Sequence, residues 1–131
     1  MSEEAMRLYL CGTINGCADD EAKSWRDEVT RLWQYGVIDP MARDYRGKEA
    51  EAYREIVDLD KRDVRECAGV IVAYERPSVG TAMKIFYAWQ LGKPIALVDR
   101  SGKPLSPWLR YHSTKITTTI DEALDWFLQI L

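Results

Sequence analysis

Apolar residues along the chain alternate between short continuous runs and stripes with helical spacing. The short runs predict β-strands at RLYLCG (7–12), VID (37–39), GVIVAY (69–74), PIALVD (94–99) and KITTTI (115–120). Apolar residues three or four positions apart predict α-helices between these strands, over 19–35, 49–67, 81–91 and from 120 onward. The two remaining long stretches are predicted to be loops, a polar one at 40–48 and a longer one at 100–113.

Local signals mark the ends of several of these helices. Gly36 is expected to end the first helix in the C′ position, which glycine occupies at little steric cost. The second helix is expected to break near Asp60, inside the charged run DLDKRDVREC. Thr119 and Glu122 have the spacing of a capping box at the start of the last helix.

This order of strands and helices predicts an α/β fold. We expect one domain over residues 1–131, with a doubly wound, mainly parallel five-stranded sheet of the flavodoxin-like or Rossmann-like kind. The continuous apolar run in GVIVAY indicates a strand that helices cover on both faces. In such sheets a ligand binds at the carboxyl ends of the strands. Function is therefore expected in the loops CGTING, DPMARD, ERPSVGT and DRSGKPLSPW.

Composition and charge narrow the classes of partner. The chain has 131 residues, of which 47% are apolar and 30% charged, with a formal net charge of −3. This balance is typical of a globular protein and argues against a nucleic-acid polymer or an anionic membrane as partner. No apolar run approaches the roughly 18 residues of a membrane span, and the N-terminus lacks the features of a signal peptide. We therefore expect a cytoplasmic protein without a membrane partner.

Cysteine and histidine usage argues against a metal site. Cys11, Cys17 and Cys67 have no metal-ligand spacing, and their odd number indicates reduced thiols. His112 is the single histidine, which argues against multi-histidine metal sites and histidine-centred triads. We interpret His112 as a structural or surface residue and expect neither a metal nor an organic cofactor.

Two of the loops combine glycine with polar side chains. In the first, Gly12 and Gly16 flank Thr13, Ile14 and Asn15, which suits either a backbone cradle over a small ligand or an ordinary turn. The spacing matches neither the dinucleotide fingerprint nor a Walker loop. Both interpretations therefore stay open for this loop.

The third loop opens a helix. There Ser78, Gly80 and Thr81 could hold a phosphate, or Ser78 could simply cap the helix. Lys84 is unexpected at this place, because the first turn of a helix already carries positive partial charge.

Other polar candidates are less distinctive on their own. Asp60 stands out because of the expected helix break, whereas its acidic neighbours, among them Asp63, are predicted to form a solvated face. We interpret Ser106 as a turn residue and Tyr9 as a core residue whose hydroxyl has a hydrogen-bond partner.

Taken together, the loops resemble those of the nucleoside 2-deoxyribosyltransferase superfamily, most closely its branch of 2′-deoxynucleoside 5′-monophosphate N-glycosidases. The similarity covers most of the chain. YLCGTING resembles the family's first loop, PSVG its phosphate loop, and SGKPLSPWLR its late serine loop. Asp60 falls at the family aspartate 18 residues before the serine of the third loop.

The resemblance implies cleavage of an N-glycosidic bond. In the family a glutamate attacks C1′ of the deoxyribose, through an oxocarbenium-like transition state, while an acid protonates the leaving base. That glutamate lies six residues after the serine of the third loop, where this chain has Lys84. A lysine would oppose the forming cation by roughly 4 kcal/mol at about 4 Å, which is about three decades in rate. We therefore predict that the usual family activity is absent or greatly weakened.

Three explanations of the lysine stay open. One is an engineered or chance substitution in an active N-glycosidase or deoxyribosyltransferase, and another is an inert nucleotide-binding or sequestering protein. Alternatively, another carboxylate such as Asp60 or Glu75 has taken over the chemistry. If the protein binds nucleotides without cleaving them, Lys84 is expected to pair with a phosphate or with Asp60.

The resemblance also implies roles for the other residues. Ser78, Gly80 and Ser106 would hold the 5′-phosphate, with Ser106 reaching it from a neighbouring subunit. Asp60 would orient the sugar or base and act as an acid. The remaining residues would line the pocket for sugar and base, namely Tyr9, Gly12, Thr13, Ile14 and Asn15. We accordingly expect a nucleoside or nucleotide ligand and a homodimer, with Trp89 and Trp108 as interface anchors.

Overall fold

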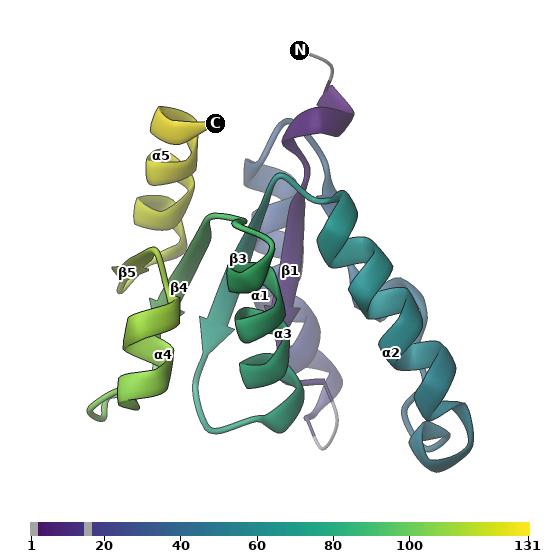
Figure 1. Ribbon diagram of the computed structural model, residues 1–131. Coiled ribbons are helices and arrows are strands. Elements are labelled where there is room, and N and C mark those ends of the chain that lie inside the picture. The colour runs from purple at the N-terminus through teal and green to yellow at the C-terminus, as the bar shows by residue number, and fades with distance from the viewer. Residues whose placement is uncertain (1–2, 15–16) are drawn as a thin grey trace.

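The computed structural model describes residues 3–14 and 17–131, in which strands and helices alternate (Figure 1). The strands are β1 (Leu8–Gly12), β2 (Val37–Ile38), β3 (Gly69–Tyr74), β4 (Ile95–Asp99) and β5 (Lys115–Thr117). The α-helices are α1 (Asp19–Leu32), α2 (Glu49–Glu66), α3 (Val79–Gln90), α4 (Pro107–His112) and α5 (Ile120–Ile130). Short 3-10 helices occur at η1 (Glu3–Met6) and η2 (Pro40–Ala42).

The strands in the described part of the chain form one parallel sheet in the order β2-β1-β3-β4-β5. Leu8 of β1 pairs with Val37 of β2 on one side and with Gly69 of β3 on the other. The chain therefore winds outward in both directions from β1 and β3, and the switch point lies between them. This arrangement confirms the predicted doubly wound α/β fold.

Successive residues of the central strands point to opposite faces of the sheet. Leu8 and Leu10 of β1 pack into a core beneath α1 and α5, whereas Tyr9 and Cys11 pack into a second core beneath α2, α3 and α4. Figure 1 shows α3 in front of the sheet and α1 behind it. Covering both faces explains why these strands are almost continuously apolar.

The segment 100–113 contains α4, so the prediction of an uninterrupted loop was wrong. Ser106 caps this helix, with its Oγ accepting a hydrogen bond from the backbone N–H of Trp108 at 3.2 Å. Pro107 occupies the first helical position, where its missing N–H costs nothing. The helix is too short to produce an apolar stripe, which is why periodicity did not reveal it.

The second helix also differs from expectation. α2 runs without interruption from Glu49 to Glu66, so the break expected near Asp60 does not exist. The charged run continues the helix, because Val64 and the neighbouring Asp63 point into the protein while the other charged side chains stay in contact with solvent. None of the helices in the described residues has the length and apolar character needed to cross a membrane.

Several element ends differ from the predicted ones. α1 ends at Leu32 because Trp33 turns into the core, where its indole N–H donates to the Met6 carbonyl at 2.9 Å. Gly36 instead adopts φ +88° in the turn before β2, a backbone conformation that favours glycine. β5 ends at Thr117, and Thr119 then forms the N-cap of α5.

The predicted N-cap at Thr119 is present, and the Glu122 carboxylate contacts the Thr119 hydroxyl instead of the backbone N–H that a full capping box uses. The Thr119 hydroxyl accepts from the backbone N–H of Glu122 at 3.2 Å, and it donates to the Glu122 carboxylate at 3.0 Å.

Candidate functional site

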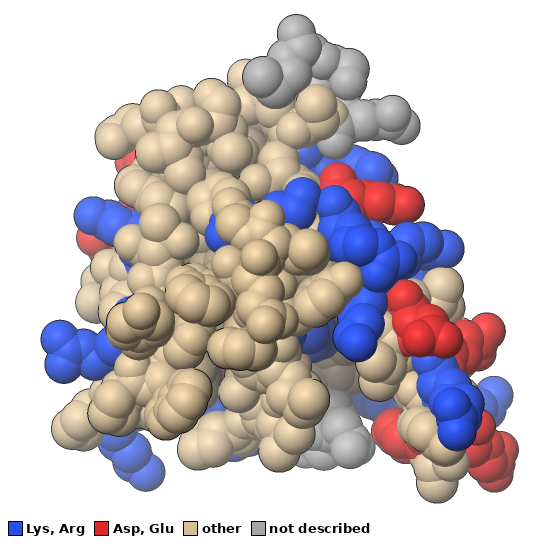
Figure 2. Space-filling model, in the orientation of Figure 1, with Lys and Arg blue, Asp and Glu red and all other residues tan. Residues whose placement is uncertain are grey.

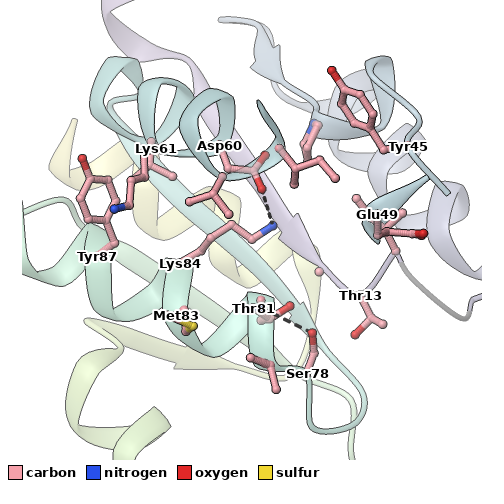
Figure 3. Close-up of a pocket in the computed structure, with 18 of the residues that line it drawn as sticks. Thr13, Tyr45, Glu49, Asp60, Lys61, Ser78, Thr81, Met83, Lys84 and Tyr87 are labelled. Atoms are coloured by element: carbon pink, nitrogen blue, oxygen red, sulfur yellow. Dashed lines mark hydrogen bonds and ion pairs between the residues drawn. The ribbon is translucent and has the colours of Figure 1, made fainter. Parts of the chain in front are cut away.

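A pocket of about 770 Å³ lies beside the carboxyl ends of β1 and β3, between α2 and α3 (Figure 3). The loop after β1, the N-terminal end of α3 and the inner face of α2 all contribute to it. Its lining includes six residues singled out from the sequence, namely Gly12, Thr13, Ile14, Asp60, Ser78 and Gly80, together with Lys84. Asn15, the remaining residue predicted in the first loop, lies outside the described residues.

Lys84 and Asp60 meet across this pocket. Figure 3 shows the Lys84 side chain extending from α3 toward Asp60 on α2, and Nζ lies 3.8 Å from Oδ2. The two side chains are only 17% and 19% exposed. At an effective dielectric of 20 the attraction at this distance is about 4 kcal/mol before the cost of desolvation. The pairing of Lys84 with Asp60 that we expected for a binding protein is therefore present.

Tyr9 of β1 contacts the ammonium group of Lys84 from the core side of the pocket. Nζ of Lys84 donates to the Tyr9 hydroxyl at 3.4 Å and lies 5.6 Å from the centre of its ring. Tyr9 is fully buried, and it lies beneath the pocket instead of among its lining residues. Burial, helped by the nearby Cys11 thiol and the Asp60 and Asp63 carboxylates, raises the pKa of Tyr9 far above its ordinary value. Its phenol consequently stays protonated and neutral beside the ammonium group.

A second cation shares the Asp60 carboxylate. Arg43 lies 3.7 Å from Asp60 and 2.6 Å from Asp63, and Arg62 also donates to Asp63 at 3.2 Å. Asp63 is buried, so the prediction that it belongs to a solvated face was wrong. It is one turn along α2 from Asp60 and on the same side, and the two carboxylates anchor Arg43 at the wall of the pocket.

The N-terminal end of α3 forms another part of the wall. Ser78 caps this helix, accepting from the Thr81 backbone N–H at 3.4 Å, and its side chain also faces the pocket. Gly80 has open space where a Cβ would stand. The Thr81 hydroxyl is buried and has no hydrogen-bond partner among the described residues. Capping and ligand binding are therefore compatible at this helix end, because a ligand oxygen could reach both free N–H groups and a hydroxyl.

Gly12 has a structural role as well as a place in the lining. A Cβ at this position would lie 2.7 Å from Cζ2 of Trp25. The Gly12 carbonyl accepts from Arg26 at 3.0 Å, and the buried Arg26 also lies 3.5 Å from Asp39 after β2. Arg26 thus ties together the loops that follow β1 and β2.

Sequence reasoning missed this role of Arg26. A signal was present, since Arg26 occupies a position of the apolar stripe of its helix, four residues after Ala22 and three before Val29.

The pocket carries more positive than negative side chains. Among its described lining residues are the cations Arg43, Arg46, Lys61, Arg76 and Lys84, against the carboxylates Glu49 and Asp60. Carboxylates that do not line the pocket neutralise part of this charge. Arg46 pairs with Asp19 and with Asp44, and Arg76 pairs with Glu21. The remaining excess favours a ligand with negative charge.

Two residues considered from the sequence lie elsewhere. Ser106 caps α4 at an exposed position and does not line the pocket. Glu75 pairs with Arg100 at 3.8 Å and is likewise not among the lining residues. Of the two carboxylates considered as replacements for the family nucleophile, only Asp60 is therefore in the pocket.

An aromatic surface covers α3 and α4. His112 is buried there among the rings of Phe86, Trp89, Trp108 and Tyr111, and its Nδ1 lies 2.7 Å from the Trp108 carbonyl oxygen. Trp108 and Tyr111 are each 72% exposed. Figure 2 shows that this face carries few charged side chains, whereas Lys, Arg, Asp and Glu gather over α2. We refer to Phe86, Trp89, Trp108, Tyr111 and His112 as the aromatic face.

No metal site is visible within residues 3–14 and 17–131. There, no group of three or more His, Cys, Asp or Glu side chains is arranged to hold an ion. The three cysteines, Cys11, Cys17 and Cys67, are unpaired.

Comparison with solved structures relates this fold to known proteins. The 2-deoxyribosyltransferase of Bacillus psychrosaccharolyticus matches with a TM-score of 0.75 at 15% identity, over 89% of each chain. The 2-deoxyribosyltransferase of Leishmania mexicana matches with a TM-score of 0.67 at 18% identity, over 95% of this chain and 98% of that one. The CMP N-glycosidase of Clostridium botulinum matches with a TM-score of 0.61 at 22% identity, over 95% and 99%.

These matches are structural, because no protein-family model and no curated protein sequence matches the chain. The chain has the deoxyribosyltransferase fold over nearly its full length, as the resemblance of its loops predicted.

Proposed function

We propose that the pocket binds a nucleoside 5′-monophosphate on a scaffold of the N-glycosidase and deoxyribosyltransferase kind, and that cleavage of the glycosidic bond is weak or absent in this chain. The observation that carries the proposal is the ion pair between Lys84 and Asp60 inside an otherwise cationic pocket. The names of the structural neighbours, two deoxyribosyltransferases and a CMP N-glycosidase, support the choice of ligand.

The N-terminal end of α3 suits the phosphate group. Its free N–H groups, the Ser78 hydroxyl and the unpartnered Thr81 hydroxyl supply donors, and Gly80 leaves room for a close approach. Apolar side chains of α2 and α3 offer a surface for the base, among them Ile56, Val57, Met83 and Phe86. The sugar would then lie between these two regions, near Lys84 and Asp60.

The same geometry opposes glycosidic cleavage. A positive side chain near C1′ disfavours an oxocarbenium ion, and the Asp60 carboxylate is already engaged by Lys84 and Arg43. The ammonium group cannot supply the carboxylate that forms a glycosyl intermediate. Lys84 therefore acts in binding, by contributing positive charge for the phosphorylated ligand.

Calorimetry with deoxynucleoside and ribonucleoside monophosphates tests the binding role. We expect saturable binding that weakens when Lys84 is replaced by Ala, while Lys103→Ala, a change in the loop before α4, leaves it unchanged. Failure of every monophosphate to bind the folded wild-type chain would overturn the proposal.

The variant Lys84→Glu tests the scaffold. It would place two carboxylates across the pocket, one of which can hold a proton while the other attacks. We expect this variant to release free base from at least one monophosphate, at a rate about three decades above wild type, as followed by chromatography. If it folds, binds nucleotide and yet releases no base from any of them, the enzyme scaffold is refuted and the binding role stands alone.

The expected homodimer is also part of the proposal. A second copy packed on the aromatic face would cover large apolar side chains that water otherwise contacts, and it would bring residues near Ser106 toward a neighbouring pocket. We also propose that the protein is cytoplasmic, as expected from its sequence. Its three unpaired cysteines fit a reducing compartment.

A further inference from the structure

Lys84 is a primary amine held inside a pocket, directly beside a carboxylate. Its Nζ has Asp60 Oδ2 at 3.8 Å and the Tyr9 hydroxyl at 3.4 Å, and the side chain is five-sixths buried. An amine with an adjacent proton acceptor can react with a carbonyl carbon to form an imine. The proposed binding role uses the charge of Lys84 and leaves the nucleophilicity of its amine unused.

We propose that Lys84 forms an imine with the C1 aldehyde of an open-chain pentose 5-phosphate bound in this pocket. The inference rests on the proposed function for one feature only, the place of the phosphate at the N-terminal end of α3. It adds a covalent step that the proposed binding role does not contain.

The dimensions of α3 suit such a ligand. Ser78 and Lys84 are six residues apart, which is about 9 Å along a helix. A five-carbon chain and the lysine side chain together can bridge this separation. Because Ser78 caps the helix that carries Lys84 and both residues line the pocket, the aldehyde of a phosphate-anchored sugar is directed toward Nζ.

The reaction balances with the groups that are present. Asp60 takes a proton from the Lys84 ammonium, and the free Nζ lone pair attacks C1 of the aldehyde. A proton moves from nitrogen to the former carbonyl oxygen and gives a carbinolamine. Asp60 then returns its proton to that hydroxyl, the C–O bond breaks, water leaves, and a protonated C=N bond remains. One aldehyde is consumed and one water is produced, with no oxidant or reductant.

The product keeps the electrostatics of the pocket. The protonated imine carries the same single positive charge as the lysine it replaces, so the ion pair with Asp60 is retained. The neutral Tyr9 phenol beneath it accepts a hydrogen bond from either cation. The pocket that stabilises the ammonium therefore also stabilises the imine.

Lys61 provides a matched control within the same pocket. It is exposed and lies over the ring of Tyr87, 5.4 Å from the ring centre. Its amine shares the pocket with Lys84 but is not held in the Asp60 and Tyr9 contacts. Non-specific modification of lysines would affect Lys61 at least as strongly as the less exposed Lys84.

Reductive trapping tests the inference. The full chain is incubated with 2-deoxyribose 5-phosphate or ribose 5-phosphate and sodium cyanoborohydride, and adducts are mapped by peptide mass spectrometry. We expect one adduct, on Lys84, forming about tenfold or more faster than on Lys61 and more slowly with phosphate-free 2-deoxyribose. Lys84→Arg, which keeps the charge, should abolish it, whereas Lys103→Arg, outside the pocket lining, should not. Asp60→Asn should slow it about tenfold or more and change its pH–rate profile.

Three results would overturn the inference: no adduct on Lys84, equal labelling of Lys61 and Lys84 in the wild-type chain, or an undiminished adduct in Lys84→Arg. The wild-type mapping does not depend on the folding of any variant. Nucleotide calorimetry run in parallel separates the two proposals. Nucleotide binding without a Lys84 adduct refutes the imine alone, and an adduct without nucleotide binding refutes the proposed nucleotide function alone.

Discussion

The ammonium nitrogen of Lys84 on α3 lies 3.8 Å from a carboxylate oxygen of Asp60 on α2. This ion pair joins two helices across the pocket and engages the carboxylate that would otherwise be available as a nucleophile. It also places an amine where the resemblance to glycosidases leads one to expect a glutamate. The contribution of the pair to stability and the reactivity of its two members can be measured separately.

The pair is expected to couple the stabilities of α2 and α3. In a double-mutant cycle with Lys84→Met and Asp60→Asn, we expect a coupling free energy of about 1 kcal/mol, because both groups are partly buried but Asp60 keeps Arg43 as a second partner. Urea unfolding of the wild type, the two single variants and the double variant measures it. Additive effects of the two substitutions would show that the contact contributes nothing to stability.

Gly12 and Gly80 line the same pocket but differ in the space around them. Gly12→Ala should destabilise the fold by about 1–3 kcal/mol, because its Cβ would stand 2.7 Å from Trp25. Gly80→Ala should instead stabilise it by about 0.4–1 kcal/mol, since nothing lies within 4 Å of the added atom and the unfolded chain loses freedom. Chemical denaturation gives both values. Equal destabilisation by the two substitutions would contradict the packing described for Gly12.

The aromatic face is expected to mediate self-association. Replacing the exposed Trp108 by Lys should turn a dimer into a monomer, because a charge would have to be buried between the two copies. Tyr53→Lys is the matched control, since Tyr53 is also an exposed aromatic residue but lies on α2. Light scattering after size-exclusion chromatography reports the mass. A wild-type chain that stays monomeric at high concentration would exclude this interface.

Acid should weaken the fold through a carboxylate at the edge of the pocket. Hydrogen bonds from the Arg46 side chain lower the pKa of Asp44 from its ordinary value of 3.8 to about 2. Between pH 4 and pH 2, Asp44 therefore binds a proton more readily in the unfolded chain than in the folded chain. The free energy of unfolding that Asp44 contributes above pH 4 is consequently lost as the pH falls toward 2. Urea midpoints measured at pH 5, 4, 3 and 2 should decline over this window.

Asp44→Asn isolates the contribution of this group to the acid response. The variant should lose less of its midpoint between pH 4 and pH 2 than the wild type does. Glu21 and Glu122, whose pKa values are also lowered by hydrogen bonds, remain as a common background in both proteins. An identical decline in both would show that Asp44 has no part in it.

Much of the site could be located from the sequence, because the loops that follow parallel strands lie together at the carboxyl ends of those strands. Parallel strands bring the loops after β1 and β3 to one edge of the sheet, and Gly12, Ser78 and Gly80 of these loops do line one pocket. Arg43 was not expected, since its partners Asp60 and Asp63 lie on another element. The α4 helix was also missed, because so short a segment has no periodicity.

The sequence by itself determined the layers of this protein and the identity of the side chains at its strand ends. Continuous apolar runs predict strands covered on both faces, and apolar stripes with a period near 3.6 predict helices that bury one face against them. Only the tertiary structure decided that Lys84 meets Asp60 and Tyr9, that Asp63 is buried, and that Ser106 lies apart from the pocket. These contacts join residues far apart in the chain, so they depend on the order of the strands and on the packing of α2 against α3. The pattern of apolar and polar residues within one element does not indicate the strand order or the packing of α2 against α3.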